Sequence, residues 1–121
     1  MSSHQPEGFD LESALEVTGG DRELLEELAQ LFIRECPSMM ADLESAIMRG
    51  DAKQIEMAAH KLKGAVTAFG GRAIAATALR IETLGKQGEL TDIDQVWTAL
   101  RKLVSPFLAE LRSLAGQQFP Q

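Results

Sequence analysis

Three residues in one stretch of the chain, His60, Lys63 and Gly64, have types and a spacing that suit phosphoryl chemistry. Residues three and four apart on an α-helix lie on the same side of it, so Lys63 and Gly64 would neighbour His60. A neutral imidazole nitrogen is a nucleophile that can attack phosphorus and hold a phosphoryl group as a phosphoramidate. Lys63 would offset the negative charge of that group. The spacing predicts a nucleophilic histidine with electrostatic support.

Gly64 has no local reason to be a glycine. Inside a helix, glycine is roughly 1 kcal/mol less favourable than alanine. Gly64 also lies well before the expected helix end at Gly70 and Gly71. A glycine one turn after His60 removes the side chain that would crowd the imidazole. We therefore expect Gly64 to give a bulky group or a partner surface access to the ring.

The helix expected from Ala52 to about Phe69 has a distinct buried side. Its apolar residues recur at steps of four and three: Ile55, Ala59, Leu62, Val66 and Phe69. This ladder leaves His60 on the solvent side. Glu56, Lys61 and Thr67 border it and are candidate partner-binding residues. Glu56, one turn before His60, either hydrogen-bonds the imidazole and raises its basicity or is an exposed acid.

No second catalytic group accompanies His60. The sequence has no phosphate-cradling G-x-x-x-x-G-K-[ST] loop, no paired carboxylates suited to magnesium and no Ser/His/Asp set. A lone Cys36 and two histidines in unrelated surroundings do not make a metal site. We expect a phosphocarrier and not an enzyme, with no cofactor or metal of its own.

Leu and Ala dominate, Tyr is absent and strict apolar alternation is rare, so the pattern predicts helices throughout. A short helix runs from the N-cap Asp10 to the Gly19 and Gly20 stop. Four amphipathic helices follow: Asp21 to about Arg49, Ala52 to about Phe69, one through Ile74 to Leu84 that stops around Gly85 to Gly88, and one from Thr91 or Asp92 to Leu114. This predicts an all-α fold, an antiparallel up-and-down four-helix bundle with a short extra N-terminal helix.

The long helix that ends near Arg49 contains Pro37. The apolar residues before and after it share one sector: Leu24, Leu28, Leu31, Phe32, Met39, Leu43, Ala46 and Ile47. We therefore predict one helix bent at Pro37, with two collinear helices as the alternative. Asp51 and Gln54 form a predicted capping box for the next helix. Phe32, Met39 and Met40 either form an apolar docking surface near His60 or pack in the core.

The composition describes one ordinary domain of 121 residues, 45% of them hydrophobic, with a net charge of −6. An acidic chain lacks the concentrated basic surface that nucleic acid requires. A single cysteine and the lack of a leader or a membrane span predict a cytoplasmic protein without membrane contact. We expect a flexible arm over residues 1–9, the bundle over 10–115 and a frayed tail over 116–121. We also expect a monomer.

The run A-A-H-K-L-K-G-A over residues 58–65 is followed by Phe69-Gly70-Gly71 and by Leu79-Arg80-Ile81-Glu82. Together these segments resemble the signature of histidine-containing phosphotransfer (HPt) domains of two-component phosphorelays. The resemblance implies that His60 is the phosphorylated histidine, Lys63 the basic residue near the phosphoryl group, and Gly64 the small residue that lets a receiver domain approach. It implies receiver domains and a hybrid histidine kinase as partners, with Mg²⁺ and catalysis supplied by the receiver.

The expected function is to accept a phosphoryl group on His60 from a receiver aspartate and to pass it to another receiver. Two alternatives stay open. A helical adaptor that is not phosphorylated would dock a receiver or a kinase. A histidine kinase dimerisation module would also present a histidine on a bundle, but it needs an adjoining ATP-binding domain, for which this chain is too short.

Overall fold

Five helices make up most of residues 9–116, the part of the chain that the computed structural model describes. They are α1 (Leu11–Val17), α2 (Arg22–Arg49), α3 (Ala52–Thr67), α4 (Arg72–Gln87) and α5 (Ile93–Leu114). The predicted all-α class is confirmed, and α2 continues through Pro37 as one helix. Residues 1–8 of the expected arm, which include His4, and residues 117–121 of the expected tail lie outside the described residues.

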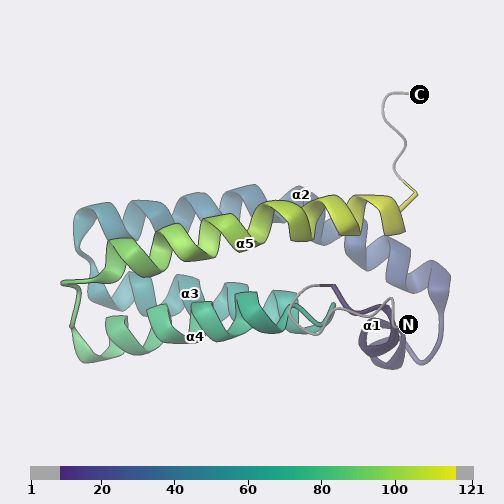
Figure 1. Ribbon diagram of the computed structural model, residues 1–121, viewed down its shortest axis with the longest axis horizontal. Coiled ribbons are helices and arrows are strands. Elements are labelled where there is room, and N and C mark those ends of the chain that lie inside the picture. The colour runs from purple at the N-terminus through teal and green to yellow at the C-terminus, as the bar shows by residue number, and fades with distance from the viewer. Residues whose placement is uncertain (1–8, 117–121) are drawn as a thin grey trace.

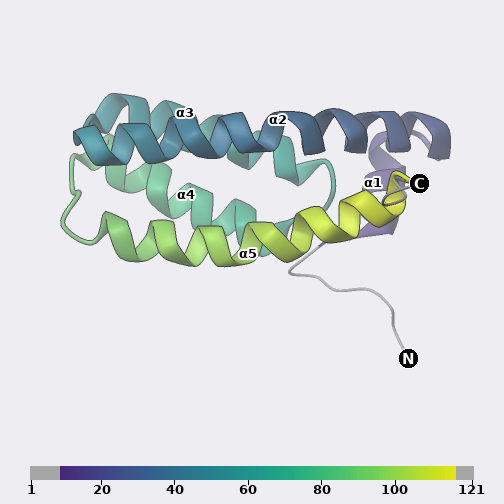
Figure 2. The ribbon, with the colours of Figure 1, turned by 90° about the horizontal axis from the view of Figure 1, so that it is seen from above.

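The four long helices lie alongside one another and run in alternating directions (Figure 1). Helix α3 contacts α2 and α4, and α5 contacts the same two helices on the other side of the molecule. Each helix therefore buries one side against two neighbours. The short α1 contacts α2 and lies at the end of the molecule where α2 begins and α5 ends (Figure 2).

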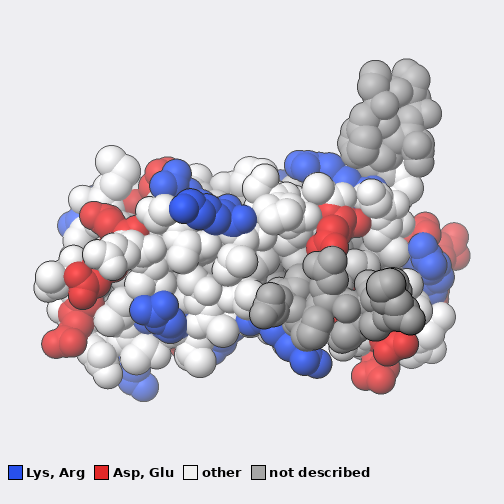
Figure 3. All heavy atoms as spheres, viewed as in Figure 1, with Lys and Arg blue, Asp and Glu red and all other residues white. Residues whose placement is uncertain are grey.

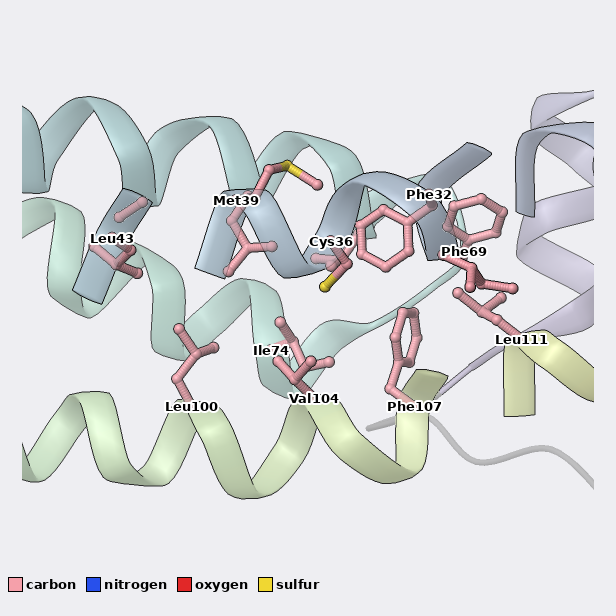
Figure 4. Close-up of a cluster of buried hydrophobic side chains, with 14 of the residues drawn as sticks. Phe32, Cys36, Met39, Leu43, Phe69, Ile74, Leu100, Val104, Phe107 and Leu111 are labelled. Atoms are coloured by element: carbon pink, nitrogen blue, oxygen red, sulfur yellow. The ribbon is translucent and has the colours of Figure 1, made fainter. Parts of the chain in front are cut away.

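Aromatic side chains from three segments fill the centre of this arrangement (Figure 4). The ring of Phe32 on α2 lies 5.7 Å from that of Phe69, which follows α3, and 6.1 Å from that of Phe107 on α5, edge to face. Cys36, one turn after Phe32, is completely buried. The core therefore joins α2 and α5 to the end of α3, the helix that carries His60.

The buried side of α2 differs from the prediction in its first half. Leu24 and Leu31, which were expected inside, are 40% and 42% exposed. The buried residues of α2 are Leu25, Ala29, Phe32, Ile33, Cys36, Met39, Leu43 and Ala46. Apolar residues occur on two adjacent sides of this helix, and periodicity alone does not decide which side meets α3 and α5. The prediction was wrong at Leu24 and Leu31, whereas it holds at Phe32, Met39, Leu43 and Ala46.

The connection between α2 and α3 is tight. Gly50 ends α2 in the left-handed region (φ 65°), and the backbone N–H of Asp51 donates to the carbonyl of Ala46 at 3.0 Å. The Asp51 carboxylate accepts from the backbone N–H of Gln54 at 3.2 Å, as an N-cap does. The predicted capping box is therefore half formed, because the Asp51 N–H that Gln54 would have bound already closes the end of α2.

Phe9, which was expected in the loose arm, belongs to the folded part. Its side chain packs against the core, and its backbone N–H donates to Glu110 Oε1 at 3.3 Å. The backbone N–H of Asp10 donates to the carbonyl of Phe69 at 2.9 Å. The start of α1 is therefore attached both to α5 and to the turn after α3.

Gly85 allows α4 to approach the first turn of α3 closely. A Cβ atom at this position would lie 2.9 Å from the carbonyl oxygen of Ala52 and 2.9 Å from the backbone nitrogen of Glu56. Any larger residue would therefore push the two helices apart. Glu82 lies three residues before Gly85 on α4, so the same close packing brings its side chain against the helix that carries His60.

Basic and acidic side chains are interspersed on the face of the molecule that α5 crosses, with uncharged atoms between them (Figure 3). Arg101 on this helix stacks over the ring of Trp97, with its guanidinium carbon 5.8 Å from the ring centroid. Within residues 9–116, no helix is both long enough and apolar enough to cross a membrane.

Candidate functional site

Helix α3 presents His60 to solvent as its sequence predicts. Ile55, Ala59, Leu62 and Val66 are all fully buried. The His60 side chain points the other way and keeps 67% of its surface exposed. The predicted division of α3 into a buried and an exposed side is confirmed, and it fixes the imidazole at the middle of the helix.

A carboxylate from α4 contacts both His60 and Lys63 of α3. Glu82 Oε2 lies 3.0 Å from His60 Nδ1, and Glu82 Oε1 lies 2.8 Å from Lys63 Nζ. The Glu82 side chain is only 17% exposed, and that of Lys63 is 28% exposed. One carboxylate therefore binds both residues, each through a different oxygen.

The contact with Glu82, together with the charge of that carboxylate, decides which imidazole nitrogen is free. The hydrogen bond from Lys63 is the largest influence and lowers the pKa of Glu82 below its ordinary value of 4.5; partial burial opposes this, and the contact with His60 adds to the lowering. Glu82 is therefore ionised at neutral pH and can only accept hydrogen bonds. Because it contacts Nδ1, that nitrogen carries the proton, and Nε2 of the neutral ring keeps its lone pair.

Glu82 was not among the residues singled out as candidates. It occurs in the segment Leu79-Arg80-Ile81-Glu82, which contributed to the family resemblance but received no role. The available signal was an acid placed directly after the buried Ile81 on the side of α4 that meets α3. Helical periodicity relates residues within α3, but it says nothing about a contact 22 residues away.

Two of the other candidates, Glu56 and Thr67, form their hydrogen bonds or ion pairs with residues other than His60. Glu56 lines the same hollow as His60 and Glu82, but its carboxylate pairs with Lys53 at 3.7 Å. The sequence left Glu56 as either an imidazole partner or an exposed acid; in the structure Glu82 contacts Nδ1, and Glu56 pairs with Lys53. The Thr67 hydroxyl donates to the carbonyl of Lys63 at 2.7 Å, within the helix itself.

Space is open beside His60 at Gly64. A Cβ atom built on Gly64 would meet no atom within 4 Å, apart from its chain neighbours and the nearby helix backbone. Packing of the domain therefore does not explain the glycine. A Cβ atom built on Gly85, in contrast, would lie 2.9 Å from backbone atoms of α3, so the two helical positions are glycine for different reasons.

An apolar groove of about 260 Å³ begins at Gly64 and runs between α3 and α2. Its lining is mostly apolar and includes the exposed Leu31: Leu28, Leu31, Phe32, Glu35, Met39, Lys61, Gly64, Ala65, Ala68 and Phe69. Phe32 and Met39 pack in the core, which confirms the second alternative, and they also line the groove; a docking role for them stays a prediction. Met40 packs against the core and is not part of the groove.

Metal binding and thiol chemistry find no support in the site. Within residues 9–116, no three His, Cys, Asp or Glu side chains form a group that could hold a metal ion. Burial raises the pKa of the Cys36 thiol to about 11, and the charge of Arg112 lowers it only in part. The thiol is therefore protonated and enclosed.

The fold and this site define a class of protein. The Hpt domain family matches residues 27–113. Because that match spans most of the chain, the protein belongs to the Hpt family, the histidine phosphotransfer domains of two-component signalling. The resemblance seen in the sequence is thereby confirmed.

Among solved structures, the chain is similar to the crystal structure of histidine-containing phosphotransfer protein B (HptB) from Pseudomonas aeruginosa PAO1. The TM-score is 0.83 at 16% sequence identity, over 98% of this chain and 99% of that one. At this identity the likeness bears on the fold alone. No curated protein matches the chain significantly.

Proposed function

We propose that this domain is a phosphorelay intermediate that accepts a phosphoryl group on His60 from a receiver-domain aspartate and passes it to another receiver domain. The observation that carries the proposal is the position of His60: a ring that is 67% exposed, with Nδ1 held by Glu82. An exposed ring with one nitrogen engaged offers the other nitrogen to an incoming phosphorus.

His60, Lys63 and Gly64 have separate roles in this mechanism. His60 Nε2 is the nucleophile, because the Nδ1 proton faces Glu82. Lys63 lies one turn further along α3 and supplies positive charge close to the phosphoryl oxygens. Gly64 leaves room for the receiver to bring its phosphorylated aspartate to the ring. The domain thus orients a nucleophile and is not itself an enzyme.

The apolar groove beside Gly64 is the proposed docking surface for the receiver. Its exposed Leu31 and its walls Phe32 and Met39 offer apolar area next to the nucleophile. Lys61 and Glu35 add charges at its edge. Of the border residues, Lys61 is therefore the best partner-binding candidate, since Glu56 and Thr67 do not line the groove.

The remaining expectations belong to the same proposal. Mg²⁺ and the catalytic groups come from the receiver, and the phosphoryl group enters the relay through a hybrid histidine kinase. The domain acts in the cytoplasm as a monomer. The packing of α2 and α4 against both α3 and α5 supports the description of the fold as an antiparallel up-and-down four-helix bundle with α1 as a short addition.

The experiment is to incubate the protein and its His60→Gln variant with a phosphorylated receiver domain and Mg²⁺. A mass increase of one phosphoryl group that is acid-labile, base-stable and absent from His60→Gln is the expected result. The apolar groove also fits the alternative function, a helical adaptor that binds a receiver without phosphoryl transfer. It predicts binding that survives His60→Gln and no labile phosphate on the wild type.

A further inference from the structure

Glu82 has a charge that orientation of the ring does not require, since a neutral hydrogen-bond acceptor would hold Nδ1–H equally well. Its carboxylate is ionised and lies 3.0 Å from Nδ1. An ionised acceptor favours a positively charged ring over a neutral one. The consequence appears only after phosphorylation, when the ring becomes positively charged.

The bond changes of the proposed reaction leave the Nδ1 proton in place. In the forward step, the Nε2 lone pair attacks phosphorus, the N–P bond forms, and the P–O bond breaks with its electrons leaving on the receiver carboxylate. The ring is then positively charged and still donates from Nδ1 to Glu82. In the transfer onward, a carboxylate oxygen of the second receiver attacks phosphorus and a new P–O bond forms. The N–P bond breaks, its electrons return to Nε2, and the ring departs as neutral imidazole.

Loss of the Nδ1 proton would block the onward step. Without that proton, the ring would have to leave as an imidazolate anion, which is a much poorer leaving group than neutral imidazole. Building on the proposed function, we propose that Glu82 is a positioning residue that retains the Nδ1 proton on phosphorylated His60 and so keeps the phosphoryl group transferable at neutral and mildly alkaline pH.

Three charged side chains surround the ring. Glu82 approaches from α4, and Glu56 and Lys63 lie one turn before and one turn after His60 on α3. The hollow beside the ring is lined only by residues of α3 and α4, so α2 contributes no charge to it. Glu56 is paired with Lys53, which makes it a matched control: the same charge in the same hollow, without a bond to Nδ1.

The test is the rate of phosphohistidine hydrolysis between pH 6 and pH 9 in the isolated full chain, charged with phosphoramidate. Compared with the wild type, the Glu82→Gln variant keeps a hydrogen-bond acceptor for Nδ1–H and removes the negative charge. We expect equal rates at the acidic end and hydrolysis about tenfold slower in Glu82→Gln at the alkaline end, because a nearby opposite charge shifts a titration by about one pH unit or more. Glu56→Gln is expected to follow the wild type.

Three results would overturn the inference. Glu82→Gln could hydrolyse more slowly than wild type by the same factor at every pH, or its hydrolysis rate could equal that of wild type throughout. The third is a pH dependence in Glu56→Gln that is shifted as much as in Glu82→Gln. A second measurement needs no variant. The ¹⁵N spectrum of phosphorylated wild type at pH 8 should show a protonated Nδ1 on His60, and an unprotonated Nδ1 would contradict the inference. If wild type carries no phosphate on His60, the proposed function itself fails as well.

Discussion

The two helical glycines, Gly64 and Gly85, should respond to alanine in opposite ways. At Gly64 the new methyl group meets no atom within 4 Å beyond its own helix, so only helix propensity changes. Alanine is about 1 kcal/mol more favourable than glycine inside a helix. For a domain of this size, the gain corresponds to a melting temperature about 4 °C higher.

At Gly85 the same methyl group would lie 2.9 Å from two backbone atoms of α3, which cannot turn aside as a flexible side chain can. Overpacking of this kind costs about 1 to 3 kcal/mol. In Gly85→Ala, the free-energy cost of overpacking is therefore at least as large as the gain in helix propensity. Gly64→Ala should therefore be more stable than wild type, and Gly85→Ala no more stable and typically less so.

Urea unfolding followed by circular dichroism would measure both variants. A second assay, phosphoryl transfer from a receiver, would test the reason for Gly64. Gly64→Gln should stay folded and slow the transfer by about tenfold to a hundredfold, since misplacement of reacting groups by about 1 Å has effects of that size. A destabilised Gly64→Ala would contradict the open space at this position, and normal transfer by Gly64→Gln would refute the steric role of this glycine.

Three other predictions follow from the structure. His60→Gln should change the melting temperature little, because the side chain is 67% exposed; a large loss of stability would contradict its placement. Phe107→Ala should cost about 3 to 5 kcal/mol in urea unfolding, since Phe107 is 2% exposed in the aromatic core, and a loss below about 1 kcal/mol would contradict that packing. Glu82 has a lowered pKa, so the stability from its ion pairs is present above pH 4.5 and is lost as the pH falls further. Melting curves of wild type and Glu82→Gln should therefore converge below pH 4.5, whereas a constant difference down to pH 3 would exclude this linkage.

Much of the fold follows from local chemistry along the chain. Asp21 and Asp51 precede apolar runs of helical period, and both cap helices in the structure. The ladder from Ile55 to Val66 places His60 on the solvent side by geometry within one helix. These features need no information about the rest of the molecule, because their contacts lie within a few residues of each other.

The site needed contacts between helices, which periodicity does not specify. Glu82 meets His60 and Lys63 only because α4 packs closely on α3, with Gly85 at the contact. In α2, Leu31 and its neighbours could face inward or outward on local pattern alone, and the positions of α3 and α5 decided the matter. The exposed position of His60 was thus evident from one helix, whereas its contact with Glu82 and the apolar groove at Gly64 depend on how separate helices pack.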